Sequence, residues 1–216
     1  MDNALDAGSK SMACGCKPYR DSRIKVMRWY DAIAEGYDEL YGEEQKAKFN
    51  LTDVKRNGAI LDCGCGTGLL LAILPHEPMT VGLDLSEKML RKAKRKLGGK
   101  VHLVQGDALT PPFRSSVFDT VYSFTVMDRE QGEALVKVVT DLLKEDGVAV
   151  ISASKKSFNP KILRGLAEAS GLKPLEVVDV EGVKDYVAVC FKRSELKSPL
   201  ESYPSSPCPK PQPQGR

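Results

Sequence analysis

Three acidic residues stand at the ends of three short apolar runs, and their spacing suits a single ligand site. Asp62 ends the run AILD, Asp84 ends TVGLD, and Asp107 follows VHLVQG. In a sheet of parallel strands, ligands bind in the crevice outside the carboxyl ends of the strands. Ionised carboxylates accept hydrogen bonds and attract cations. The three acids therefore predict a site for a ligand that carries hydroxyl, amino or cationic groups.

A glycine-rich segment surrounds the first of these acids in ILDCGCGTG, residues 60–68. Gly64, Gly66 and Gly68 alternate with other residues after the apolar strand. Glycine permits tight turns and lets a ligand approach the main chain, because it has no Cβ atom. This loop together with an acid after each of three strands is more specific than any one of these motifs alone.

The spacing of the glycines argues against a nucleotide phosphate as the ligand. A dinucleotide fold requires G-x-G-x-x-G, but the sixth position is Leu69 when counted from Gly64 and Leu71 when counted from Gly66. The Gly-Lys-Ser/Thr of a phosphate-binding P-loop is absent from this sequence. Asp62, just before the loop, would repel an anion, whereas it would attract a sulfonium or an ammonium group.

The other two acids suit the remaining parts of a nucleoside. Asp84, at the end of the second strand, can accept hydrogen bonds from both ribose hydroxyls. Asp107 can face the exocyclic amine of an adenine, while Ala108 keeps a backbone amide free for the ring. A cationic adenosine derivative therefore satisfies all three acids.

These features resemble the class I S-adenosylmethionine-dependent methyltransferases, above all the branch that includes ubiquinone and menaquinone C-methyltransferases. The resemblance covers about residues 29–192. It rests on WYDAIAEGYDELY, ILDCGCGTG, VGLDLSEKML, VQGDALTPPF and FDTVYSF. It implies a seven-stranded sheet with one antiparallel strand, and S-adenosylmethionine as the cofactor.

The resemblance also implies a cofactor-binding role for particular residues. The implied roles are these: Asp62, Gly64, Gly66, Thr67 and Gly68 hold the methionine part; Asp84 binds the ribose; Leu85 and Met89 flank the adenine; Asp107 and Ala108 read the adenine edge; Ser123 lies near the sulfonium; and Tyr37 helps to close the site. Two roles have a structural alternative, because Met89 equally suits the core and Tyr37 equally suits packing of a helix on the sheet.

Strand and helix patterns alternate along the chain. Such alternation predicts an α/β fold, a doubly wound seven-stranded and mostly parallel sheet with one antiparallel strand and helices on both faces. Strands are predicted at 59–64, 80–85, 101–107, 117–124, 147–153, 175–180 and 185–191, and helices within 28–57 and at 69–74, 86–97, 135–143 and 159–171.

Composition predicts the boundaries of the folded unit. Residues 1–26 show no clear hydrophobic period and are predicted to be a disordered extension, residues 27–193 a methyltransferase domain, and residues 194–216 a disordered proline-rich tail. No apolar run approaches the roughly 20 residues of a membrane helix. The six cysteines lack the spacing of a secreted scaffold and suit reduced thiols in the cytoplasm, and no metal site is predicted.

The methyl acceptor is not encoded in any motif of the sequence. Asp128 and Arg129 follow the fourth strand, where this fold places acceptor-facing groups, and are the candidates for the substrate pocket. The Asp/Asn-Pro-Pro-Tyr/Phe motif of many amino-methyltransferases is replaced by SFTV at 123–126. A small-molecule acceptor is favoured. The alternatives are an RNA or protein acceptor with a small activator partner, and an inactive subunit that only binds.

A run of basic residues at 88–96 has two interpretations. It forms either the solvated face of a helix or a phosphate-binding surface for RNA. The second is the weaker, because no aromatic residues are interleaved for base stacking. The net charge of +3 does not by itself indicate nucleic acid.

Overall fold

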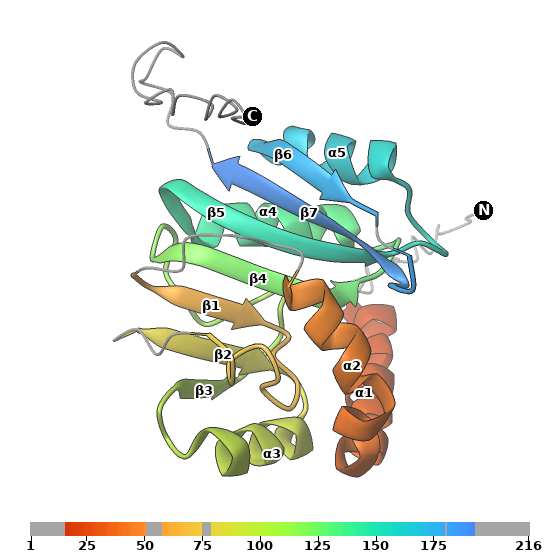
Figure 1. Ribbon diagram of the computed structural model, residues 1–216, viewed down its shortest axis with the longest axis vertical. Helices are drawn as coiled ribbons and strands as arrows, with labels where there is room; N and C mark the ends of the chain where they lie inside the picture. The colour runs from red at the N-terminus through yellow and green to blue at the C-terminus, as the bar shows by residue number, and fades with distance from the viewer. Residues whose placement is uncertain (1–15, 51–57, 75–78, 180, 193–216) are drawn as a thin grey trace, which may run out of the picture.

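The computed structural model describes residues 16–50, 58–74, 79–179 and 181–192. Within these ranges helices and strands follow one another in an α/β order (Figure 1). The elements are α1 (Cys16–Ile33), η1 (Ala34–Gly36), α2 (Tyr37–Asn50), β1 (Ile60–Cys63), β2 (Thr80–Asp84), α3 (Glu87–Leu97), β3 (His102–Gln105), β4 (Phe118–Met127), α4 (Gly132–Leu142), β5 (Leu143–Ser154), α5 (Pro160–Ala169), β6 (Leu172–Val178) and β7 (Asp185–Lys192).

The strands form one sheet in the order β3-β2-β1-β4-β5-β7-β6. The pairs among β3, β2, β1, β4 and β5 are parallel, whereas β7 is antiparallel to both β5 and β6. The last two strands are adjacent and connected by a short turn, which leaves no room for a crossover helix. The predicted fold class is confirmed, including the single antiparallel strand.

Alternation along the strands divides the core into two layers. Leu61 and Val121 pack in the layer that contains α4 and α5, whereas Ile60 and Tyr122 pack in the layer that contains α2, α3 and the turns after β1. Successive side chains of a strand point to opposite faces, so both faces of the sheet need an apolar cover. Figure 1 shows α4 behind the sheet and α2 in front of it.

Helix α3 forms as its sequence predicts. Ser86 is its N-cap and accepts a hydrogen bond from the backbone N–H of Met89 at 3.1 Å. Gly98 ends the helix in the left-handed conformation, with φ of 58°. The buried stripe contains Leu90, Ala93 and Leu97 in addition to Met89. Asn159 and Pro160 begin α5 in the same predicted manner.

Two predicted segments were wrong. Residues 69–74 form a series of turns in place of a helix, because both i→i+4 and i→i+3 hydrogen bonds occur there, from Ala72 to Gly68 and from Ile73 to Leu70. Helix α1 begins at Cys16, within the segment predicted to be disordered. Its polar residues find partners elsewhere in the fold, as Arg23 pairs with Asp107. Residues 1–15 and 193–216 lie outside the described residues.

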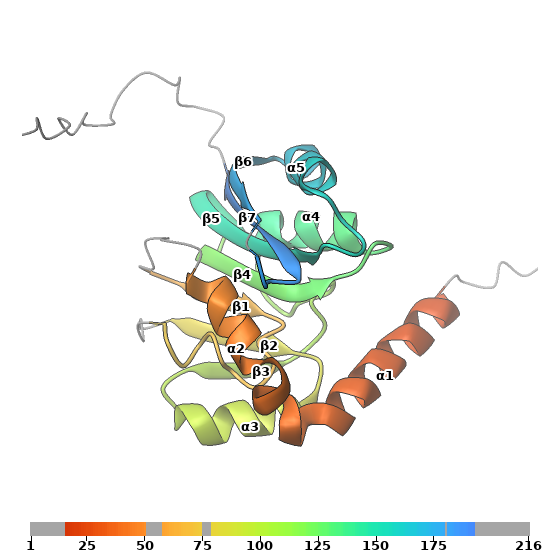
Figure 2. The same cartoon turned by 45° about the vertical axis from the view of Figure 1, so that its right-hand side comes forward.

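Helices α1 and α2 lie beside the carboxyl ends of the parallel strands. Figure 2 shows α1 projecting to one side of the sheet, past these strand ends, while α2 turns back across the sheet. Exposed ion pairs attach this region to α3, from Glu35 to Lys92 at 3.1 Å and from Asp38 to Lys96 at 2.6 Å. None of the helices in the described ranges has the length and hydropathy to cross a membrane.

Candidate active site

A cavity of about 640 Å³ lies at the carboxyl ends of β1, β2 and β4 and extends beneath α1. Among the predicted site residues that line it are Asp84 and Asp107. A second cavity of about 30 Å³ adjoins it and is lined by Asp62 and Thr67. Tyr37, Gly64 and Gly66 line both spaces, so the three acids predicted from the sequence line two neighbouring cavities.

Most of the predicted residues come together here. Those lining the large cavity are Tyr37, Gly64, Gly66, Asp84, Leu85, Asp107, Ala108 and Asp128. The predicted residues that line neither cavity are Gly68, Met89, Ser123 and Arg129.

The residues outside the cavities have other surroundings. Gly68 packs the glycine loop against α3, where an added Cβ would lie 3.2 Å from that of Ala93. Met89 and Ser123 are fully buried. Among the described residues, the Oγ atom of Ser123 has no hydrogen-bond partner. Arg129 is exposed on the turn after β4. The cofactor contacts of Gly68, Met89 and Ser123, and the acceptor-facing role of Arg129, remain predictions.

Asp84 connects the glycine loop to the start of α3. Its Oδ2 accepts a hydrogen bond from the Gly66 N–H and its Oδ1 one from the Ser86 N–H, both at 2.8 Å. Burial raises the pKa of Asp84 above its ordinary value, although these backbone hydrogen bonds oppose the shift. The carboxylate is thereby fixed in orientation and faces the large cavity.

Asp62 is a carboxyl group whose surroundings favour a cationic ligand. It is 3% exposed, and burial, followed by the charge of Asp84, raises its pKa to about 8. A nearby ammonium or sulfonium group would favour the ionised form and lower this pKa. Beside it, Gly64 adopts φ of 86°, and a Cβ there would lie 2.2 Å from Cγ2 of Val126. The donor set and the narrow loop fit the methionine end of S-adenosylmethionine.

Asp107 is held from two sides. Its Oδ1 accepts a hydrogen bond from the Leu109 N–H at 3.0 Å, and its Oδ2 lies 2.7 Å from Nε of Arg23 on α1. The side chains of Arg23 and Asp107 are 37% and 10% exposed. This ion pair brings α1 against the end of the site where the adenine is predicted.

Aromatic residues of α1 and α2 face the strand ends. The Tyr37 ring lies 6.4 Å from that of Tyr30 and 5.1 Å from that of Tyr41, measured between centroids. Burial raises the pKa of both Tyr30 and Tyr37, so these phenols stay neutral at physiological pH. Trp29 also lines the large cavity and is 51% exposed. These rings form an apolar wall opposite β4.

Asp128 has a structural contact as well as a place in the cavity. Its Oδ1 accepts a hydrogen bond from the Gln131 N–H at 2.7 Å, directly before α4. Such a bond is typical of a residue that stabilises the start of a helix. A role toward the acceptor stays a prediction.

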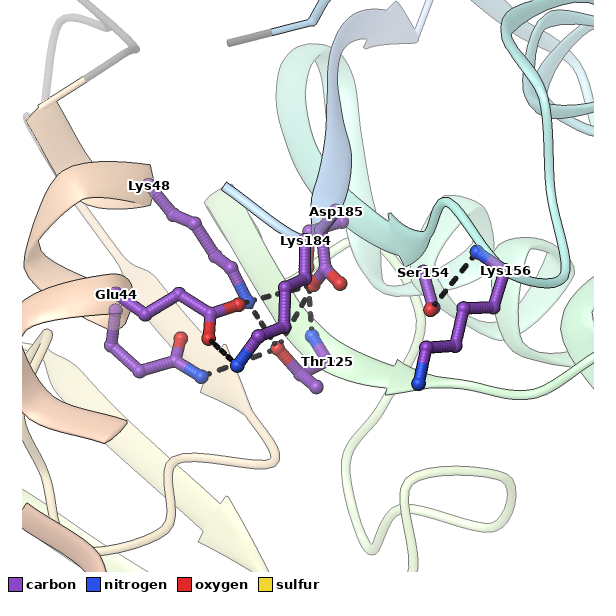
Figure 3. A network of polar contacts seen from close by, with 9 residues as sticks. Glu44, Lys48, Thr125, Ser154, Lys156, Lys184 and Asp185 are labelled. Carbon is purple, nitrogen blue, oxygen red and sulfur yellow. Dashed lines mark hydrogen bonds and ion pairs between the residues drawn. The ribbon is translucent and has the colours of Figure 1, made fainter. Parts of the chain in front are cut away.

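The sequence patterns did not identify a polar network, buried except at Thr125, which is shown in Figure 3. It consists of Lys48 on α2, Thr125 on β4, Ser152 on β5 and Asp185 on β7, and Asp185 Oδ2 accepts from the other three side chains. These residues are far apart in the chain, and each type alone resembles a surface residue. The sequence signal that could have revealed this network is the spacing of Gly42, Gln45 and Lys48 in α2. These residues are three positions apart and lie on the buried face of the helix.

Comparison with known proteins identifies the family. A profile described as a methyltransferase domain matches residues 60–147. An uncharacterized methyltransferase of Geobacillus sp. strain WCH70 is 39% identical over 148 residues, which cover 65% of this chain and 69% of the relative. The chain belongs to the class I S-adenosylmethionine-dependent methyltransferases, and S-adenosylmethionine is its cofactor.

Solved structures share the fold at low sequence identity. The 1,6-didemethyltoxoflavin N1-methyltransferase of Burkholderia thailandensis was solved with 1,6-didemethyltoxoflavin and S-adenosylhomocysteine bound. It has a TM-score of 0.66 at 17% identity, over 89% of this chain and 99% of that one. The structure of a complex between the Haloferax volcanii Trm112 activator and a methyltransferase has a TM-score of 0.64 at 16% identity, over 76% of this chain and 98% of that one.

Proposed function

We propose that this methyltransferase acts on a small-molecule acceptor that binds beneath α1, opposite the end of β4. The observation that carries this proposal is the cavity of about 640 Å³, which extends from Asp84 and Asp107 to Val26, Trp29 and Tyr30 of α1. Its volume, part of which the adenosine end of the cofactor would occupy, falls within the roughly 300–1,000 Å³ of small-molecule sites. Because α1 lines the acceptor side, a compact acceptor fits better than a folded macromolecule.

The cofactor is placed along the strand ends in this proposal. Asp84 binds the ribose, with Leu85 beside the adenine, while Asp107 and Ala108 contact its edge. Asp62 and the loop of Gly64, Gly66 and Thr67 hold the methionine end, and Tyr37 covers it. The placement is supported by the position of Asp84, Leu85, Asp107, Ala108 and Asp62 at one edge of the sheet. It is also supported by the burial of the Asp62 carboxyl group, which raises its pKa.

The protein contributes mainly alignment and exclusion of water. S-adenosylmethionine supplies a methyl group that is already activated on a sulfonium. The rings of Trp29 and Tyr30 exclude water and orient a planar or apolar acceptor toward the ends of β1 and β4. For an acceptor that must lose a proton, Asp128 at the cavity edge is the candidate base.

A macromolecular acceptor with an activator partner is the second candidate. The fold similarity to a methyltransferase solved with the Trm112 activator favours it. Helix α1 across the cavity argues against it, since RNA or protein would have to displace or bypass this helix. Cys63, Cys65 and Cys190 are free thiols, which supports a reducing compartment such as the cytoplasm for either candidate.

Calorimetric titration of the full chain with S-adenosylmethionine, beside NAD, tests the cofactor site. We expect one-to-one binding of S-adenosylmethionine, and about 10- to 100-fold weaker binding by Asp84→Ala, since hydrogen bonds to charged groups contribute about 1.5–3 kcal/mol. Labelled methyl transfer to small-molecule, RNA and protein fractions then tests the acceptor. Transfer confined to RNA or protein would overturn the small-molecule proposal.

A further inference from the structure

Helix α2 is attached to the sheet by a face that is mostly polar. Its buried residues are Gly42, Gln45, Lys48 and Phe49. Phe49 is the large apolar side chain among them, and its ring lies 5.1 Å from that of Phe124 on β4. Burial of Phe49, which belongs to the core layer on this face of the sheet, contributes to the docking of α2. The other large buried side chains, Gln45 and Lys48, are polar, so polar contacts also hold the helix in place.

Lys48 provides the most deeply buried of these contacts. Its Nζ lies 2.8 Å from Asp185 Oδ2 and 3.0 Å from Thr125 Oγ1. The side chains of Lys48 and Asp185 are only 1% and 4% exposed. Glu44 also lies 3.3 Å from the ammonium group. An ion pair so fully desolvated requires its partners to stay in register, because either charge alone would be costly.

The same network holds a strained residue of β4. Thr125 has φ of 60°, which is unfavourable for a β-branched side chain. Its N–H donates to Ser152 Oγ at 2.8 Å and its hydroxyl lies 3.1 Å from Asp185 Oδ2. Ser152 also donates to Asp185 at 2.8 Å. Thr125 is thus fixed at both its backbone and its side chain, as strained residues at functional sites commonly are.

The strained residue and α2 together shape the methionine end of the site. Thr125 is flanked by Phe124, which lines the small cavity, and by Val126, which packs against Gly64. Gln45 of α2 donates to Thr125 Oγ1 at 3.3 Å and lines the same small cavity. Figure 3 shows Lys48 from α2 and Asp185 from β7 converging on Thr125 of β4.

We propose that Lys48 and Asp185 are positioning residues for the methionine end of the cofactor. They hold α2 and Thr125 so that Gln45 and Phe124 enclose the small cavity beside Asp62. This inference rests on the cofactor placement given under the proposed function. A buried ion pair contributes little net stability compared with apolar packing, so its use at the wall of a ligand cavity suits a positioning role.

The test compares two ligands that differ at the methionine end. S-adenosylhomocysteine carries the amino-acid part, whereas 5′-methylthioadenosine lacks it, and both occupy the adenosine end. Their dissociation constants are measured by calorimetry for the wild type, Lys48→Met and Asp185→Asn. We expect S-adenosylhomocysteine to bind at least tenfold more weakly to each variant, with 5′-methylthioadenosine changed by less than about twofold.

Lys46→Met is the matched control, because Lys46 lies on the same helix and pairs with Glu43 in an exposed position. It should leave both dissociation constants unchanged. An equal loss for both ligands in Lys48→Met, or no loss for either, would overturn the inference. A wild-type chain that fails to bind S-adenosylhomocysteine would instead overturn the cofactor placement.

Two milder variants cover the case in which a lone buried charge prevents folding. The double variant Lys48→Met/Asp185→Asn removes both charges together, and Thr125→Ala removes the hydroxyl that connects Gln45 and Lys48 to Asp185. Each should raise the ratio of the two dissociation constants, by about threefold for Thr125→Ala. An unchanged ratio in these folded variants counts against the proposal.

Discussion

The two ends of the cofactor cavity are built in different ways. At the methionine end, Asp62 is buried and α2 is held by desolvated polar contacts. At the adenosine end, Asp107 pairs with the partly exposed Arg23 of α1. The exposed pair between Glu35 and Lys92 attaches η1, which follows α1, to α3. Desolvation strengthens electrostatic interactions, whereas solvent screens exposed ones. Substitutions should therefore change stability and ligand affinity strongly at the methionine end and weakly at the adenosine end.

The largest effect is expected from Gly64→Ala at the methionine end. A Cβ at Gly64 would meet Val126 at 2.2 Å while φ is 86°, whereas at Gly66 no atom lies within 4 Å and φ is 52°. We expect Gly64→Ala to destabilise the chain by roughly 2–4 kcal/mol through overpacking and backbone strain, and Gly66→Ala by about 1–2 kcal/mol. Urea unfolding measures both. An equal loss of unfolding free energy in the two variants would show that Val126 of β4 does not constrain the glycine loop at Gly64.

Asp62 should make the methionine end sensitive to pH. Its pKa is about 8 in the folded chain and 3.8 is its ordinary value, so the folded state binds more protons between these values. Stability from this group is fully present below about pH 4 and is lost as pH rises to about 8. Conversely, the affinity for S-adenosylhomocysteine should rise by up to about tenfold per pH unit between about pH 6 and 8, because its ammonium group favours the ionised carboxylate.

Asp62→Asn separates this effect from general pH dependence. Thermal unfolding of the variant should lose less stability than the wild type over the same range. Its affinity for S-adenosylhomocysteine should be nearly constant with pH. Parallel curves for the two proteins would assign the titration to another group, of which Asp84 is the nearest candidate because its pKa is also raised.

The sequence predicted the acids of the site because topology alone brings them together. Asp62, Asp84 and Asp107 each follow a parallel strand, so any doubly wound sheet places them at one edge. The segment 69–74 was mispredicted because a short apolar run has no period that distinguishes a helix from buried turns. The start of α1 at Cys16 was missed because its contact with Asp107 depends on the tertiary structure.

The polar network was missed for a related reason. Lys48 and Asp185 are separated by 137 residues, and nothing local distinguishes them from solvated charges. Thr125 has a positive φ and is hydrogen-bonded to Ser152 and Asp185, which are distant in the sequence. The conformational preference of threonine disfavours a positive φ, so it cannot predict one here. Functional or strained sites are where sequence rules are expected to fail.

Arg23→Gln tests the adenosine end and should have a modest effect. The pair with Asp107 is 2.7 Å long, but the Arg23 side chain is 37% exposed. Exposed ion pairs contribute about 0–1 kcal/mol, which corresponds to a change of up to about fivefold in affinity. We expect 5′-methylthioadenosine and S-adenosylhomocysteine to weaken together within this limit by calorimetry. A loss of tenfold or more would show that the two ends are equally dependent on charge.

The smallest effect is expected where the basic run of α3 meets the N-terminal helices. Lys96 is 27% exposed and pairs with Asp38 at 2.6 Å, whereas Arg91 pairs with Glu87 within α3 itself. The run thus docks η1 and α2 in part, a role that neither sequence interpretation included. Asp38→Asn removes the charge but keeps an oxygen that can accept the hydrogen bond from the Thr67 hydroxyl. It should therefore cost less than about 1 kcal/mol by urea unfolding, and the cost should shrink in high salt.

Arg91→Met is the control for this contact, since it removes a charge from the same helix without touching α2. Its stability should match the wild type, and RNA binding by either variant should match the wild type as well if the run serves docking. A specific loss of RNA affinity in Arg91→Met would restore the phosphate-binding interpretation. It would also place an interaction surface on α3 and favour the macromolecular acceptor over the small molecule.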